Sequence, residues 1–163
     1  IGQYDDYDNV KFETEKILDL IKVNFLCIVN FINFLEKNNK FCKEAYISVC
    51  SSVTTFAQRD KQTFYSISKH SLDRYVESLR IYNNRNNINI YVNNFIIGVL
   101  EKPMKQSKKI PNKYFATSIK VVANFIAQNN LSKNKNFIFP KWWIVIKFVF
   151  LFLPKFLRST LIK

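Results

Sequence analysis

Apolar positions recur along this chain with two periods, and each period predicts a different kind of element. From 12 to 39 they repeat at intervals of three and four residues, which predicts one long helix. Its apolar stripe has one polar member, Asn24, among Ile17, Ile21, Ile28, Phe31 and Leu35. The run 44–50 (EAYISVC) is short and β-prone, so it predicts a buried strand that leads through Ser51 and Ser52 into a loop over 53–62.

The same alternation continues toward the C-terminus. We predict a helix over 63–84, a strand over 88–95, a lysine-rich loop over 101–110, a helix over 111–128 that begins at Pro111, and a strand over 136–140. This order is typical of an α/β domain in which helices connect parallel strands. Three strands are few for a parallel sheet, which normally has about five or six. The pattern therefore indicates part of a larger sheet.

Composition limits the kind of site that the chain can build alone. The sequence contains two glycines, Gly2 and Gly98. Glycine-rich phosphate cradles such as GxGxxG and GxxxxGK[ST] need at least two glycines close together, so neither motif is present. This excludes a self-contained dinucleotide or P-loop site. The chain also starts without Met, and we expect it to be a fragment or a processed product.

The net charge of +13 has two interpretations. A basic protein is expected to bind nucleic acid or an anionic membrane surface. The alternative is an AT-rich coding sequence, since 20 lysines stand beside 5 arginines and asparagine and isoleucine each occur 19 times. The basic residues are scattered without an Arg-aromatic pattern, so no specific nucleic-acid binding is predicted.

Metal and redox chemistry have little support in the sequence. Cys27, Cys42 and Cys50 form an odd set without CxxC spacing, and His70 is the only histidine, so no metal site is expected. Reduced thiols fit a cytoplasmic protein, and the acidic start IGQYDDYDNV lacks the features of a signal peptide.

The helix over 63–84 contains a pair with chemical potential. Tyr65 and Lys69 fall on one stripe with Leu72, Val76 and Leu79. His70 and Arg74 fall on the opposite side, so His70 is predicted to be a surface residue without a catalytic role. A phenol that titrates near ~10 is a poor acid–base catalyst at neutral pH, and a nearby ammonium favours the phenolate. The lysine alternatively snorkels to solvent.

Two upstream residues make the pair more specific. Ser52 stands thirteen residues before Tyr65, at the carboxyl end of the first predicted strand, where α/β sheets place their ligand crevice. Together with Asn24, the runs KVNF, ISVCSS, YSISKHSL and IGVLEKPM resemble the short-chain dehydrogenase/reductase family, in its compact branch. The resemblance covers roughly 1 to 130 and only the second half of the family's domain.

The resemblance implies a fold and a domain division. The fold would be a partial Rossmann-like, doubly wound parallel sheet of about three strands with flanking helices, its N-terminal half missing. Residues 1–140 would form the C-terminal half of the dehydrogenase domain, and 141–163 an apolar and basic tail helix. The family's TGxxxGxG turn and NNAG motif are absent, so the chain alone is expected to be an inactive fragment.

The resemblance also implies a mechanism. A nicotinamide cofactor, NAD or NADP, would exchange hydride with a carbonyl or secondary alcohol substrate. Tyr65 would exchange the proton, and Lys69 would lower the pKa of the tyrosine and hold the nicotinamide ribose. Ser52 would hydrogen-bond the oxyanion, and Asn24 would position a water. The residues alone also allow purely structural roles. Ser52 would then cap the end of a strand, and Asn24 would satisfy the backbone at a helix bulge.

The resemblance implies further cofactor contacts in the segment after the second predicted strand. Gly98, Val99 and Lys102 would bind the cofactor, with Gly98 where the backbone approaches it closely. The segment departs from the family in Ile97, where proline is usual, and in Lys102, where threonine is usual. The choice between NAD and NADP rests on a residue of the missing half.

The tail over 142–153 (WWIVIKFVFLFL) leaves two interpretations open. As a helix it would be about 18 Å long, too short to cross roughly 30 Å of hydrocarbon. In the first interpretation it lies on a membrane as a peripheral contact, which favours an apolar or lipid-like substrate. In the second it closes over the substrate pocket or packs in a homo-oligomer interface. An alternative function is a non-catalytic, basic, membrane-associated protein on a degenerate dehydrogenase scaffold.

Overall fold

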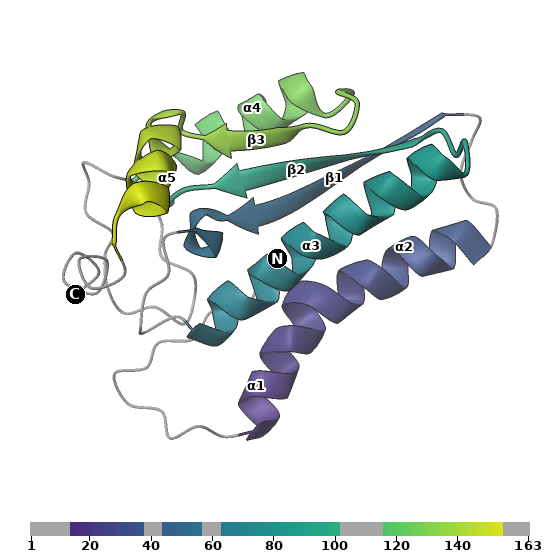
Figure 1. Ribbon diagram of the computed structural model, residues 1–163, viewed down its shortest axis with the longest axis horizontal. Helices are drawn as coiled ribbons and strands as arrows, with labels where there is room; N and C mark the ends of the chain where they lie inside the picture. The colour runs from purple at the N-terminus through teal and green to yellow at the C-terminus, as the bar shows by residue number, and fades with distance from the viewer. Residues whose placement is uncertain (1–13, 38–43, 57–62, 102–115, 155–163) are drawn as a thin grey trace.

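The computed structural model describes residues 14–37, 44–56, 63–101 and 116–154. Along the chain its elements are α1 (Thr14–Ile21), the π-helical segment η1 (Lys22–Leu26), α2 (Cys27–Lys37), β1 (Ala45–Ser52), the 3₁₀ turn η2 (Val53–Thr55), α3 (Thr63–Arg85), β2 (Ile90–Ile97), α4 (Ile119–Asn129), β3 (Asn136–Phe139) and α5 (Trp142–Phe152). Figure 1 shows the helices on either side of a small sheet, with α5 at the end where the strands terminate.

The described strands form one parallel sheet in the order β1-β2-β3. Ala45 pairs with Ile90 and Ser52 with Ile97, and β3 pairs with the second half of β2. Helices α3 and α4 make the two crossovers, as parallel neighbours require. This confirms the predicted α/β fold, a partial Rossmann-like parallel sheet with flanking helices.

The two faces of the sheet are covered differently. On one face, α3 and the α1–α2 run pack over a core of aliphatic side chains: Ile32, Val49, Leu72, Val76, Leu79 and Val92. On the other face α4 places Phe125 against Phe95 of β2 and against Phe137 and Phe139 of β3, with ring centroids 4.3 to 6.1 Å apart. The sheet is thus buried on both faces around β2.

The first helix contains a π-helical turn, and this changes which of its residues are buried. The continuous prediction over 12–39 holds for 14–37, but η1 inserts one extra residue per turn at Asn24. The predicted stripe is therefore wrong at Phe31, which is 61% exposed, whereas its neighbour Ile32 is 1% exposed. Ile28 of the stripe does pack against the core, as predicted. Among the described helices this run alone has the length and apolarity of a membrane span, a test that helices of globular proteins also pass.

Several predicted boundaries need correction. The helix predicted over 111–128 begins at Ile119, because Leu100 and Thr117 form a β-bridge that keeps the chain extended before it; residues 111–115 lie outside the described ranges. The strands predicted over 44–50 and 88–95 run over Ala45–Ser52 and Ile90–Ile97, and the two pair along their whole length. The last strand ends at Phe139, before Pro140.

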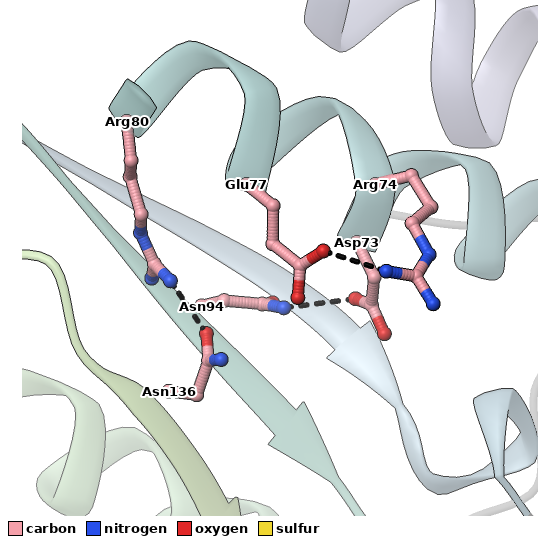
Figure 2. Close-up of polar contacts among 6 residues, drawn as sticks. All are labelled: Asp73, Arg74, Glu77, Arg80, Asn94 and Asn136. Carbon is pink, nitrogen blue, oxygen red and sulfur yellow. Dashed lines mark hydrogen bonds and ion pairs between the residues drawn. The ribbon is translucent and has the colours of Figure 1, made fainter. Parts of the chain in front are cut away.

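Arg80 ties α3 to both strands beneath it (Figure 2). Its guanidinium donates a hydrogen bond of 2.9 Å to the Asn136 side chain. It also donates to the carbonyls of Val92 and Lys135, at 2.8 Å each. On the same helix, Asp73 accepts a hydrogen bond of 2.8 Å from Asn94. These contacts fix the direction of α3 along the sheet, and so the position of the residues at its other end.

We predict that Arg80→Met lowers the free energy of unfolding by about 1–2 kcal/mol, because the carbonyls of Val92 and Lys135 lose charge-assisted donors. Arg74→Met is the matched control, since Arg74 makes an exposed pair with Glu77 at 2.9 Å, worth less than about 0.5 kcal/mol. Denaturant unfolding monitored by circular dichroism measures both variants. Equal losses in the two variants would contradict the clamp role of Arg80.

Candidate active site

Tyr65 and Lys69 lie on the buried face of the first half of α3, one helical turn apart. They are 8% and 6% exposed, and Leu72, Val76 and Leu79 continue the same buried stripe, as predicted. His70 and Arg74 are exposed, also as predicted. The pair is therefore held in the interior, where its charges are only weakly screened.

Lys69 does not snorkel to solvent. Its ammonium donates a hydrogen bond of 3.1 Å to the backbone carbonyl of Cys50 in β1, and lies 5.9 Å from the ring centroid of Tyr65. Burial lowers the pKa of the Lys69 amine from its usual value, while the nearby Cys50 and Asp73 oppose this shift. A cation fixed beside a phenol favours the ionised phenolate.

Ser52 is the last residue of β1 and is 8% exposed. Its hydroxyl accepts hydrogen bonds from the backbone amide and the side chain of Thr54, at 3.3 and 3.1 Å, and so caps the η2 turn. Both bonds use lone pairs of the oxygen, which leaves the O–H for donation. The capped strand end and a donor role toward a substrate oxygen are therefore compatible.

Asn24 lies within the π-helical turn and is fully buried. Its side-chain amide donates a 3.2 Å hydrogen bond to Ser68, whose hydroxyl in turn donates to the Tyr65 carbonyl at 2.7 Å. Asn24 therefore lies at a helix bulge, and π-bulges are frequent at functional sites. Asn24 reaches the site through the residue that precedes Lys69.

Two serines that the sequence interpretation missed, Ser66 and Ser68, connect these parts. Ser68 links Asn24 to the turn of α3 that holds Tyr65 and Lys69. Ser66 donates a 2.7 Å hydrogen bond to the carbonyl of Thr54, which joins the start of α3 to the turn after Ser52. The signal that could have found them is the run YSISK, in which these two serines stand between Tyr65 and Lys69.

Gly98 has a structural reason to be glycine. A Cβ atom at this position would lie 2.8 Å from Cδ1 of Trp143 in α5 and closer still to its indole nitrogen. The Trp143 nitrogen is buried without a hydrogen-bond partner among the described residues. The cofactor contacts predicted for Gly98 and Val99 stay predictions, and Lys102 lies outside the described residues.

Helix α5 covers the carboxyl end of the sheet. Trp143, 6% exposed, packs with Val53 and Ile96, and Phe56 and Val99 border this cluster. The inner face of α5 therefore packs next to the candidate site, which agrees with the second interpretation of the tail. The outer face of α5 is considered below.

Comparison with known proteins shows the fold. No protein-family model matches the sequence, and no curated protein matches it. Among solved structures, a short chain dehydrogenase from Burkholderia cenocepacia J2315 in complex with NADP has a TM-score of 0.73 at 14% identity, over 100% of this chain and 65% of that one.

Two further structures are similar. The 3-hydroxyacyl-CoA dehydrogenase type-2 from Mycobacterium avium has a TM-score of 0.63 at 13% identity, over 85% of this chain and 61% of its own. A 4-hydroxyisoleucine dehydrogenase complexed with NADH and succinate has a TM-score of 0.60 at 18% identity, over 84% and 62%. The chain spans about three fifths of the length of these proteins, and over that part it shares their fold.

The buried Lys69 predicts a specific pH dependence of stability. Because folding lowers the pKa of Lys69, the folded state gains stability relative to the unfolded chain as pH rises through the lowered value toward 10.5, and loses it as pH falls. Lys69→Met has no such group. We expect the unfolding free energy of the wild type, minus that of Lys69→Met, to increase over this pH window in urea titrations. A difference independent of pH would show that Lys69 is solvated.

Proposed function

We propose that the chain carries the chemistry-bearing half of an NAD(P)-dependent oxidoreductase that interconverts a carbonyl and a secondary alcohol. The observation that carries the proposal is the burial of Tyr65 and Lys69 one turn apart, with Lys69 bonded to β1 two residues before Ser52. Two of the similar structures are complexes with NADH and with NADP, which supports a nicotinamide cofactor.

Each residue of the site has a role that its environment suits. Tyr65 exchanges a proton with the substrate oxygen. The Lys69 ammonium stabilises the phenolate, and its remaining donors suit the hydroxyls of a nicotinamide ribose. Ser52 donates its O–H to the developing oxyanion, a preorganised contact that can be worth a few kcal/mol. Asn24 fixes the turn of α3 between Tyr65 and Lys69 through Ser68. A bound nicotinamide supplies or accepts the hydride.

The residues present fit the nicotinamide end of the cofactor better than its phosphate end. With two glycines far apart in sequence, the chain has no glycine-rich turn to cradle a pyrophosphate. In the described part of the chain, β1 also pairs on one side only, although parallel sheets usually extend further. A complete site thus needs strands and a phosphate cradle from residues that this sequence does not contain.

We infer an apolar substrate. The carboxyl end of the sheet is bordered by Val53, Phe56 and Val99 and covered by Trp143 of α5, so an apolar cluster begins at the residue that follows Ser52. Apolar walls favour a lipid-like carbonyl or alcohol over a charged one. The substrate is expected to present its oxygen to Tyr65 and Ser52.

The activity is tested in this chain joined to a short-chain dehydrogenase nucleotide-binding half, by NAD(P)H oxidation with a panel of apolar ketones. We predict that Tyr65→Phe lowers turnover by at least about a hundredfold, because the proton donor is lost. Tyr82→Phe is the matched control, since Tyr82 lies on the same helix but is 54% exposed. Undiminished turnover in Tyr65→Phe would refute the proposal, and an inactive wild type would favour the non-catalytic scaffold.

The chain of 163 residues without such a half is predicted not to bind NAD or NADP, because its sequence contains no glycine-rich phosphate-binding motif. Isothermal titration calorimetry of the folded chain against each dinucleotide checks this. Tight binding would show that another group of residues holds the phosphates, and the division into two halves would be wrong.

A further inference from the structure

Helix α5 has a buried inner face and an exposed outer face. Its inner face is buried through Trp143, with Trp142 and Ile146 beside it. The outer face of α5 consists of apolar residues only, each 38% to 79% exposed: Ile144, Val145, Phe148, Val149, Leu151 and Phe152. Contiguous exposed apolar surface of this kind marks a site of interaction with a protein or a membrane.

The charge of the chain is divided sharply along the sequence. All 12 acidic residues lie within residues 1–101, where 12 lysines and arginines balance them. Residues 102–163, which include α5, contain 13 lysines and arginines and no aspartate or glutamate. The whole net charge of +13 therefore belongs to the part of the chain that carries the apolar helix. Biased codon usage alone would not remove acidic residues from one segment only.

The basic residues stand at the edges of the outer face. Lys141 precedes the first turn of α5 and is exposed, and Lys147 is exposed at the border between the two faces, with its amine 5.9 Å from the ring centroid of Phe56. Such long side chains can reach lipid headgroups while the apolar side chains enter the acyl region. The helix is about 16 Å long, too short to cross roughly 30 Å of hydrocarbon.

We propose that the outer face of α5 docks on an anionic lipid surface, with the helix lying in the plane of the interface. A second copy of the chain is a poor occupant, because it would bring two segments of the same strong positive charge together. A nucleic acid suits the charge but offers no partner for six exposed aliphatic and aromatic side chains. An anionic membrane satisfies both features.

The docking would also orient the candidate site. Helix α5 lies at the end of the sheet where the strands terminate (Figure 1), and Trp143 joins its inner face to Gly98 and Val53. A membrane under α5 would therefore face the carboxyl ends of β1 and β2. The docking itself does not rest on the proposed function, because vesicle binding is measured without an activity assay.

The test is binding of the full chain to vesicles, by co-sedimentation and by fluorescence. We expect binding to phosphatidylcholine vesicles containing about one third phosphatidylserine, weaker binding to pure phosphatidylcholine, and a decrease with added salt. The only two tryptophans of the chain, Trp142 and Trp143, lie in α5. Brominated acyl chains should therefore quench its tryptophan fluorescence on binding.

Substitutions at exposed positions separate the contributions of apolar side chains and of charge to vesicle binding. The triple variant Val145→Ser, Phe148→Ser and Phe152→Ser is expected to weaken binding by about tenfold or more. The matched control is Phe31→Ser with Phe34→Ser on α2, since these phenylalanines are 61% and 57% exposed in the neutral part of the chain. Lys141→Glu with Lys147→Glu should reduce the dependence on phosphatidylserine, and Lys22→Glu with Lys37→Glu should reduce it less.

Three results would overturn the proposal. One is a folded wild type that does not sediment with the anionic vesicles. Another is equal loss of binding in the outer-face variant and in the Phe31 and Phe34 control, with circular dichroism showing both folded. The third is self-association in sedimentation velocity that the outer-face variant abolishes while vesicle binding stays unchanged, which would identify a second copy as the occupant.

Discussion

The amine of Lys69, held inside the protein by the carbonyl of Cys50, is the interaction on which the rest of the site depends. A buried ammonium is costly unless it is hydrogen-bonded, so α3 must lie close along β1 to keep that contact. Contacts at both ends of α3 keep it there: Ser66 bonds to Thr54 near its start, and Arg80 and Asn83 bond to β2 toward its end. The same placement puts Tyr65 beside the amine and near the end of β1.

A second constraint comes from the helix that packs on α3. The π-helical turn lets Asn24 reach Ser68 between two turns of α3, and it also rotates the following residues, so that Ile32 rather than Phe31 enters the core. One local irregularity therefore serves both the site and the packing. In a regular helix, Asn24 would point into the apolar stripe and would not reach Ser68. A buried amide left without a hydrogen-bond partner lowers the stability of the fold by about 1–3 kcal/mol.

Much of this arrangement could be predicted from the sequence, for identifiable reasons. The stripe of Tyr65, Lys69, Leu72, Val76 and Leu79 follows helical geometry, and the serine at the end of β1 follows from strand length. The effect of the π turn on Phe31 could not be predicted, because periodicity assumes a regular helix. The contact of Trp143 with Gly98 joins residues 45 positions apart in the sequence, so no local pattern contains it. The late start of α4 depends on the Leu100–Thr117 bridge, which is also non-local.

The proposed site requires a lysine amine that is charged, hydrogen-bonded and shielded from water, beside a tyrosine. The most direct measurement is an NMR titration of the Lys69 amine in isotope-labelled protein, assigned by comparison with Lys69→Met. We expect the pKa of this amine to lie below the usual 10.5, because burial disfavours the charged form. A pKa at or above 10.5 would place the amine in solvent or against an acidic partner and would contradict the proposed site.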